Sequence, residues 1–225
     1  MYSDPHELTE LPLSTLALNI PGATAILHHY RLDFCCRGQQ SLAEACLNRN
    51  LDLERVVQDL SPLLSRGQKA TDWTQYTTRD LTQHIVQNYH EQHRQQLPEL
   101  IRLARRVERV HVQHPSCPHG LTDFLDQMVQ ELESHMIKEE QVLFPMLNHQ
   151  PGHRPEGPIA VMMREHVQHG EALDHMRQLT SDIQTPDDAC TTWRALYHEL
   201  HHLEEQLMEH IHLENHVLFA GLTQE

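Results

Sequence analysis

The second half of the chain carries apolar side chains at alternating steps of three and four residues. That spacing keeps side chains on one face of an α-helix packed in a bundle. One such stripe comprises Leu121, Leu125, Met128, Leu132, His135, Glu139, Val142 and Met146. His135 and Glu139 are polar, yet the spacing predicts that they are buried with the others. A buried polar group without a hydrogen bond costs about 2 kcal/mol or more, so the fold must supply partners for both.

Four helical patterns of this kind follow one another from Arg79 onward. They are separated by "HPSCPHG", "NHQPGHRPEGP" and "TSDIQTPDDAC", which are rich in helix breakers and turn formers. Short connections favour antiparallel packing of consecutive helices. We therefore predict an all-α protein in which residues 79–225 form an antiparallel four-helix bundle.

A smaller region precedes the bundle. In "SLAEACLNRNLDLERVVQDL", Ser41 followed by Glu44 predicts a capping box at the start of a helix. The stretch "SPLLSRGQKATDWTQYTT" then brings Pro, Gly and polar residues. We predict a small helical N-terminal domain over residues 1–64 and a linker over residues 65–78.

The bundle region contains an internal repeat. "HMIKEEQVLF" from His135 matches "HIHLENHVLF" from His210, 75 residues later, with His, Glu, Val, Leu and Phe in register. The later stripe comprises Leu196, Leu200, Leu203, Leu207, His210, Glu214 and Val217. The first helix has the stripe Val86, His90, His93, Leu97, Leu100 and Ala104, and the third has Ile159, Met162, His166, His169, Leu173 and Met176. The region is thus two helical hairpins, each supplying one His from its first helix and a His-x-x-x-Glu pair from its second.

This arrangement suits a pair of metal ions. Side chains four positions apart lie on one helix face, so four histidines and two glutamates converge inside the bundle, with the carboxylates as natural bridges. Two cations also compensate two buried carboxylates, which an apolar core would otherwise leave protonated. Imidazole and carboxylate without thiolate favour iron over structural zinc. We predict two iron ions with an oxide or hydroxide bridge, held by His90, His135, Glu139, His166, His210 and Glu214.

Simpler interpretations exist for isolated positions. A single buried His is usually a hydrogen-bonded core residue, and an isolated His-x-x-x-Glu pair is common on helix surfaces; six residues placed by a repeat favour the dinuclear site. His93 and His169 are extra ligands, partners that orient the ligating rings, or polar residues at the core edge, and we prefer the last two. Glu165, beside His166, either lines an access path or faces solvent.

Charge and hydropathy exclude several classes of partner. The chain of 225 residues has 17 Lys and Arg against 32 Asp and Glu, a formal net charge of −15, which disfavours nucleic acid and anionic membrane surfaces. The mean hydropathy is −0.57, no run of 18 apolar residues occurs, and "MYSDPHELTE" does not resemble a signal peptide. We expect a cytoplasmic protein. Five cysteines that include an adjacent pair agree with a reducing compartment, and Cys117 and Cys190 are interpreted as incidental thiols.

Several longer motifs resemble one family. "VERVHVQHPSCPHGL", "SHMIKEEQVLFPM" and "LMEHIHLENHVLF" are similar to the di-iron proteins known as the repair of iron centres family, whose bundle is hemerythrin-like, and "LDFCCRGQQSLAEAC" resembles their N-terminal domain. The resemblance covers nearly the whole chain. It implies a non-haem di-iron centre with the six ligands named above, bridged by both glutamates. It also implies repair of iron-sulfur clusters damaged by nitric oxide or oxidants.

The cysteine pair departs from the family at one position. Family members follow it with two glycines, whereas here Arg37 and then Gly38 follow Cys36. A missing Gly affects a tight turn, while an Arg near a thiol would lower the thiol pKa. Cys35 and Cys36 are interpreted as a redox or iron-transfer element, with two small buried residues as the alternative.

Three activities fit these residues. In the first, iron is donated to a damaged cluster with the help of the thiols. In the second, the di-iron centre acts as a nitric oxide reductase that forms nitrous oxide with electrons from an unidentified donor. In the third, the bundle only binds or senses dioxygen or nitric oxide; the cysteine-containing domain disfavours it. The expected partners are therefore damaged iron-sulfur proteins and a small diatomic ligand.

Overall fold

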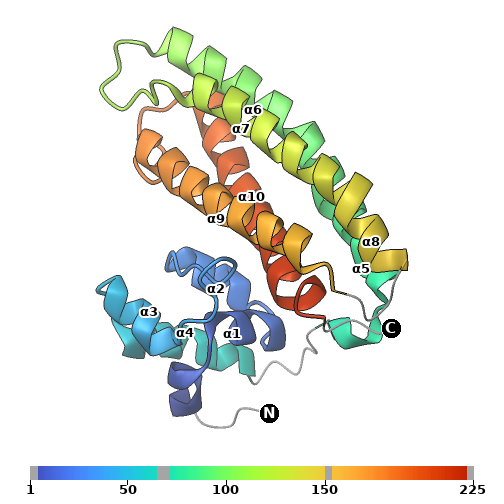
Figure 1. Ribbon diagram of the computed structural model, residues 1–225. Coiled ribbons are helices and arrows are strands. Elements are labelled where there is room, and N and C mark those ends of the chain that lie inside the picture. Colours follow the sequence, from blue (N-terminus) through green and yellow to red (C-terminus); the bar gives the residue numbers. More distant parts are fainter. Residues whose placement is uncertain (1–4, 65–70, 150–153, 222–225) are drawn as a thin grey trace. The chain divides into compact units, whose positions relative to one another are not determined.

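The computed structural model describes residues 5–64, 71–149 and 154–221, and every regular element in these ranges is a helix apart from one isolated bridge between Pro12 and Ser41 (Figure 1). This confirms the all-α prediction. Two compact units form: the described residues of Met1–Thr77 together with those of Met208–Gln224, and the described residues of Thr78–Leu207. The domain bounds predicted from the sequence stay a prediction, and residues 65–70 of the predicted linker lie outside the described residues. No helix among the described residues is long and apolar enough to cross a bilayer.

The first unit is built from short helices. They are the 3-10 helix η1 (Pro5–Glu10), α1 (Leu13–Asn19), α2 (Ala23–His29), α3 (Leu42–Asn48), α4 (Leu53–Leu64) and the 3-10 helix η2 (Trp73–Gln75). The predicted capping box starts α3: the Glu44 N–H donates to Ser41 Oγ at 3.2 Å, and the Ser41 N–H donates to Glu44 Oε2 at 3.1 Å. The same unit contains the end of α10 (Thr191–Leu213) and the π-helical turn η5 (Glu214–Leu218).

The second unit is the four-helix bundle. Its first helix is α5 (Thr78–Ile85), the π-helical turn η3 (Val86–His90) and α6 (Glu91–Val110); its second is α7 (Leu121–Lys138), the π-helical turn η4 (Glu139–Leu143) and α8 (Phe144–His149). The third is α9 (Glu156–Leu179), and the fourth is α10 (Thr191–Leu213) as far as Leu207. Figure 1 shows α6 beside α7 and α9 beside α10. A buried ion pair between Arg177 and Glu204 joins α9 to α10.

Two predicted stripe positions on the second helix are wrong. Val142 and Met146 are 51% and 38% exposed, whereas Leu143 and Leu147 are buried. The cause is the π-helical turn η4, which accommodates one residue more than an α-helical turn and shifts the buried face by one position.

The same shift occurs on the first helix, where the π-helical turn η3 ends at His90. Ile85 is fully buried and the predicted Val86 is only half-buried. The third stripe, which has no such turn, is buried at all six predicted positions.

Candidate metal centre

Glu139 lies among three imidazoles inside the bundle. Its Oε2 is 3.4 Å from His90 Nε2 and 3.4 Å from His135 Nε2, and its Oε1 is 4.0 Å from His166 Nε2. All four side chains are at most 2% exposed. Two ligand atoms that each lie about 2.1 Å from one metal ion are separated by roughly 3 to 3.5 Å. The donor types and the two spacings of 3.4 Å therefore suit the binding of a metal ion.

A carboxylate holds the opposite ring nitrogen of two of these histidines. His90 Nδ1 is 2.8 Å from Glu140 Oε1, and His135 Nδ1 is 2.9 Å from Glu165 Oε2. Such a partner favours the tautomer that carries its proton on Nδ1, and Nε2 is then the nitrogen able to accept a metal ion. The sequence singled out Glu165 but missed Glu140, which is 50 residues from His90 and carries no signal of its own.

Each of these carboxylates is paired with a cation. Arg94 Nη1 lies 2.9 Å from Glu140 Oε1, and Lys138 Nζ lies 2.6 Å from Glu165 Oε1. Burial alone would raise the pKa of Glu140, but hydrogen bonds from His90 and Arg94 hold that pKa below its ordinary value. The carboxylate thus stays ionised as a hydrogen-bond acceptor for His90.

The second His-x-x-x-Glu pair of the repeat, His210 and Glu214, lies in the first unit. His210 Nε2 is 3.2 Å from Glu214 Oε1, and both side chains are buried. Glu214 begins the π-helical turn η5, as Glu139 begins η4. The two His-x-x-x-Glu pairs therefore have the same local backbone, which supports the repeat found in the sequence.

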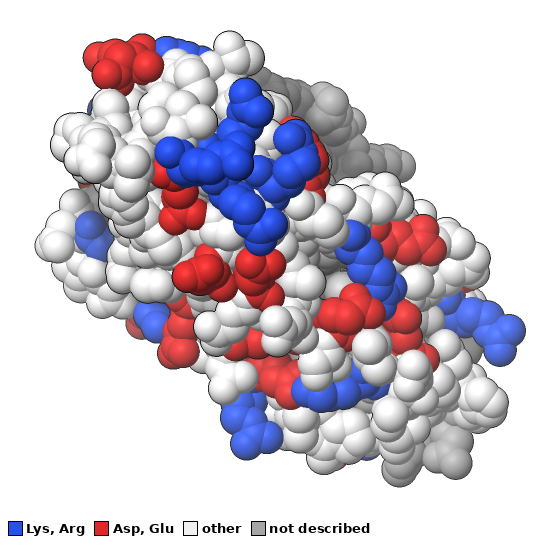
Figure 2. Space-filling model, turned by 90° about the horizontal axis from the view of Figure 1, so that it is seen from above, with Lys and Arg blue, Asp and Glu red and all other residues white. Residues whose placement is uncertain are grey.

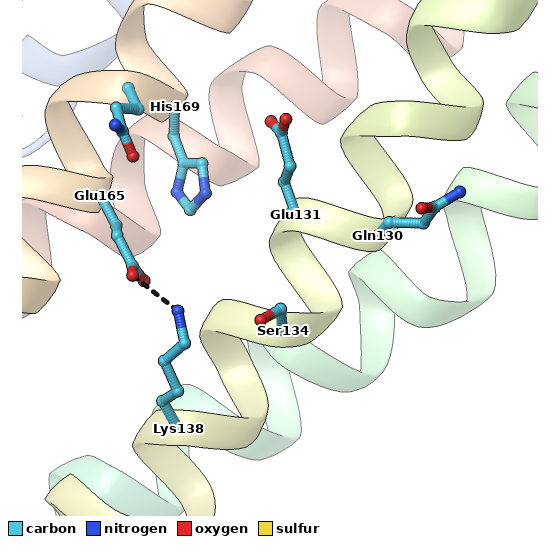
Figure 3. Close-up of a pocket in the computed structure, with 7 residues that line it drawn as sticks. Gln130, Glu131, Ser134, Lys138, Glu165 and His169 are labelled. Atoms are coloured by element: carbon cyan, nitrogen blue, oxygen red, sulfur yellow. Dashed lines mark hydrogen bonds and ion pairs between the residues drawn. The ribbon is translucent and has the colours of Figure 1, made fainter.

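An open pocket of about 490 Å³ in the bundle is lined by one of its buried histidines, His169. Figure 3 shows Glu165 and Lys138 joined across it and His169 beside them. The His169 ring packs edge-on against the His135 ring, with centroids 4.7 Å apart, and His93 is fully buried. Glu165 thus both contacts the His135 ring and lines this pocket. The lining residues are Gln130, Glu131, Ser134, Lys138, Glu165, Gln168 and His169.

The cysteine pair lies in a tight loop of the first unit. Cys35 and Cys36 are not joined in a disulfide, and their Sγ atoms are 3.5 Å apart. Asp33 Oδ1 accepts a hydrogen bond from the Cys36 N–H at 2.8 Å and lies 3.3 Å from Cys35 Sγ. Hydrogen bonding to the Cys36 thiol, together with burial, raises the pKa of the Cys35 thiol.

Arg37 does not act on Cys35 as the sequence suggested. Its side chain is 72% exposed and its Nε lies 4.0 Å from Asp33 Oδ2, so the guanidinium is directed to the carboxylate. The expected lowering of the thiol pKa is therefore wrong for Cys35, and Arg37 fits at a position where the family has Gly. The other two cysteines named above lie elsewhere: Cys117 is buried, and Cys190 Sγ is 3.2 Å from His111 Nε2.

Comparisons with known proteins agree with this architecture. The Hemerythrin HHE cation binding domain matches residues 81–222, and a domain of unknown function named ScdA_N (DUF542) matches residues 9–64. The iron-sulfur cluster repair protein YtfE of Dickeya chrysanthemi (strain Ech1591) is 47% identical over 207 residues, 92% of this chain and 94% of the relative. The protein of the same name from Escherichia coli O17:K52:H18 is 46% identical over 208 residues, with the same coverage. The Shigella boydii serotype 4 protein is 45% identical over 208 residues. This chain therefore belongs to the hemerythrin HHE cation-binding family and, within it, to the family of these iron-sulfur cluster repair proteins.

Proposed function

We propose that the protein is a non-haem di-iron protein that repairs iron-sulfur clusters damaged by nitrosative or oxidative stress. Glu139 carries the proposal, because one buried carboxylate faces imidazoles from different helices, as a bridging ligand must. The relatives named as cluster repair proteins support the repair role over simple ligand binding. Damaged iron-sulfur proteins are then the partners.

The proposed ligand set follows the internal repeat. The repeat gives each hairpin one His and one His-x-x-x-Glu pair, so the two irons are held by His90, His135, Glu139, His166, His210 and Glu214. Both glutamates bridge, and their negative charge is compensated by the two cations. Six protein ligands leave open coordination positions on both ions for a small molecule or for an oxide or hydroxide bridge.

The surrounding side chains keep the ligands in place. Glu140 and Glu165 each hold a proton on Nδ1 of a ligating histidine. Arg94 and Lys138 keep these two carboxylates oriented and charged. Lys138 and Glu165 also line the pocket beside His169, which is the route we propose for small molecules (Figure 3).

A di-iron centre so held supplies either iron for a damaged cluster or two electrons for the reaction 2 NO + 2 H⁺ + 2 e⁻ → N₂O + H₂O. The open pocket suits both uses, because iron and nitric oxide each need a path between the buried histidines and solvent. An external electron donor would be needed for repeated turnover of the second.

The metal proposal is tested by iron analysis and Mössbauer spectroscopy of the purified protein. We expect two coupled irons per chain, and replacement of Glu139 by Gln should leave fewer than one. Glu171, an exposed carboxylate on α9, is the control: the Glu171→Gln variant should keep both irons. A tightly held zinc ion, or a single uncoupled iron, would contradict the proposal.

The repair activity is tested with the reduced protein under anaerobic conditions. Nitric oxide is added in one assay and nitrous oxide is measured; in another, recovery of a damaged iron-sulfur protein is followed. We expect product or recovery with the native chain and neither with Glu139→Gln. If the iron-loaded native protein gives neither, the repair role is wrong, and the metal analysis alone decides whether the di-iron site is correct.

A further inference from the structure

The loop that contains Cys35 and Cys36 brings three potential ligand atoms close together. Asp33, Cys35 and Cys36 each place one such atom within 4.8 Å of the other two. The two Sγ atoms are 3.5 Å apart, and Cys35 Sγ is 3.3 Å from Asp33 Oδ1. Two thiolates bound to one ion at about 2.3 Å each are roughly 3.8 Å apart in tetrahedral geometry. The loop therefore needs only a small adjustment to hold a metal ion.

Side chains from the end of the chain hold this loop in place. Asn215 Nδ2 donates to Cys35 O at 3.0 Å, and His216 Nε2 also lies 3.0 Å from that oxygen. His212 Nδ1 is 3.2 Å from Phe34 O, and the two rings pack edge to face. Three side chains thus contact two consecutive carbonyl groups of the thiol loop, which limits its conformations.

Gly38 allows this close packing. A Cβ at this position would lie 2.4 Å from Phe34 O and 2.8 Å from His216 Nε2, and it would also lie 2.8 Å from Ser14 Cβ. Ser14 further fixes the loop, because its Oγ–H donates to Gly38 O at 3.0 Å. The loop conformation is therefore determined by its packing, as expected for a site with preset ligand positions.

We propose that Asp33, Cys35 and Cys36 form a second metal site, which takes a single divalent cation of borderline softness such as Fe²⁺. The two sulfurs and one carboxylate oxygen provide three ligands, and solvent or a partner's ligand completes the coordination. Both thiols lose a proton to solvent as the metal-sulfur bonds form, so one bound M²⁺ releases up to two protons and no electron is transferred. Mixed thiolate and carboxylate ligands distinguish this site from the imidazole-rich one in the bundle.

The site is built for exchange rather than for permanent retention. The Asp33 side chain is 30% exposed and Cys36 is half-buried, so an ion can reach the ligands from solvent. Arg37 is directed to the same carboxylate, and its positive charge disfavours a bound cation. Resting on the proposed function, we assign the site the role of receiving iron on its way from the di-iron centre to a damaged cluster.

The site itself is tested with Co²⁺, a spectroscopic probe, added anaerobically to the reduced, iron-loaded full-length protein. We expect one further equivalent to bind and to give thiolate-to-cobalt charge-transfer absorption. That absorption should be lost in Cys36→Ser and kept in Cys190→Ser. Asp33→Asn retains the acceptor for the Cys36 N–H and should weaken Co²⁺ binding at least about tenfold, whereas Arg37→Ala should tighten it.

Several results would overturn the assignment. These are no thiolate absorption in the native protein, the same absorption in Cys36→Ser, or equal affinity in the native protein and Asp33→Asn. Circular dichroism of each variant shows whether the fold is kept. Arg37→Ala is predicted to bind Co²⁺ more tightly, a result that partial unfolding cannot produce.

The transfer role is tested separately with ⁵⁷Fe-loaded protein and an iron-depleted cluster protein. Cys36→Ser should keep its di-iron content and transfer iron at least about tenfold more slowly than the native chain. Equal rates would overturn the transfer role. If the native chain transfers no iron, the proposed donation is wrong, whereas the cobalt result still decides whether the second site exists.

Discussion

At the scale of single residues, Glu140 and Glu165 orient the rings of His90 and His135, two of the proposed metal ligands. Glu165 accepts the Nδ1 proton of His135 and is paired with Lys138. Loss of such a partner typically lowers metal affinity about 10- to 100-fold. We therefore predict that Glu165→Ala binds iron about 10- to 100-fold more weakly than the native protein in competition with a chelator. Lys138→Ala should have a smaller effect on iron affinity. Chelator competition followed by absorbance measures both.

Glu171→Ala is the control for this series, because Glu171 is an exposed carboxylate on the same helix, α9. Equal iron retention in Glu165→Ala and Glu171→Ala would mean that the hydrogen bond to His135 does not support metal binding.

A second prediction at this scale concerns Gly38. Because an added Cβ would meet a backbone oxygen at 2.4 Å, Gly38→Ala forces the thiol loop or His216 to move. Overpacking of this kind costs roughly 1 to 3 kcal/mol. Urea unfolding should show that loss. Gly157→Ala is the control, since nothing lies within 4 Å of its added Cβ, and it should be neutral or slightly stabilising. Equal stability of the two variants would show that the loop is not held as described.

At the scale of elements, the π-helical turns decide which side chains reach the core. Leu143 is 1% exposed and Val142 is 51% exposed. A regular α-helical stripe predicts instead that Val142 is buried. Leu143→Ala should therefore lower the free energy of unfolding by about 2 to 5 kcal/mol, and Val142→Ala by less than about 0.5 kcal/mol. Thermal or denaturant unfolding of the two variants measures this. Similar losses, or a larger loss at Val142, would contradict the assigned register.

The same turns show how far the sequence could predict the elements. The four helices, the capping box at Ser41 and the buried positions of the third stripe follow from periodicity and local hydrogen bonding. A π-helical turn adds one residue to a helical turn without changing the composition of the sequence. A constant period of 3.6 residues therefore predicts wrongly that Val86 and Val142 face the core. Three of the helices that carry the proposed ligands contain such a turn next to a ligand.

The candidate site was predictable to a different degree. Its histidines and glutamates could be predicted because the repeat places them at equivalent positions in two hairpins. The contacts of Glu140 with His90 and of Arg94 with Glu133 could not be predicted. The two residues of the first contact lie 50 positions apart in the sequence, and those of the second lie 39 apart. The contact of Asn215 with the thiol loop spans 180 positions. Side-chain partners at such separations follow from tertiary packing and leave no periodic signal.

At the scale of the whole molecule, the net charge of −15 is not distributed as one uniform acidic surface. On the face shown in Figure 2, Lys and Arg side chains lie among Asp and Glu side chains. Exposed pairs such as Arg102 with Glu99 contribute little to stability because water screens them. The charges that matter for folding are therefore the buried ones, above all Glu139 and Glu214, each of which is fully buried.

This leads to a prediction about metal removal. Ions that bind only the folded chain stabilise it, by about 2.7 kcal/mol for each site at a free concentration 100 times Kd. Without metal, Glu139 and Glu214 of the proposed set are buried carboxylates with no cation to compensate their charge, which makes their burial costly. We expect the iron-free protein to melt several degrees below the iron-loaded protein, and calorimetry on both forms measures the difference.

The Glu139→Gln variant completes this test, because it lacks the buried charge as well as the ligand. Its melting temperature should hardly change when iron is removed, and it should lie above that of the iron-free native protein, since a neutral amide costs less to bury than a carboxylate. If the native protein melted at the same temperature with and without iron, these carboxylates would be satisfied by the protein alone. Metal would then bind a fold that does not depend on it, and Glu139 would not be the bridging ligand proposed here.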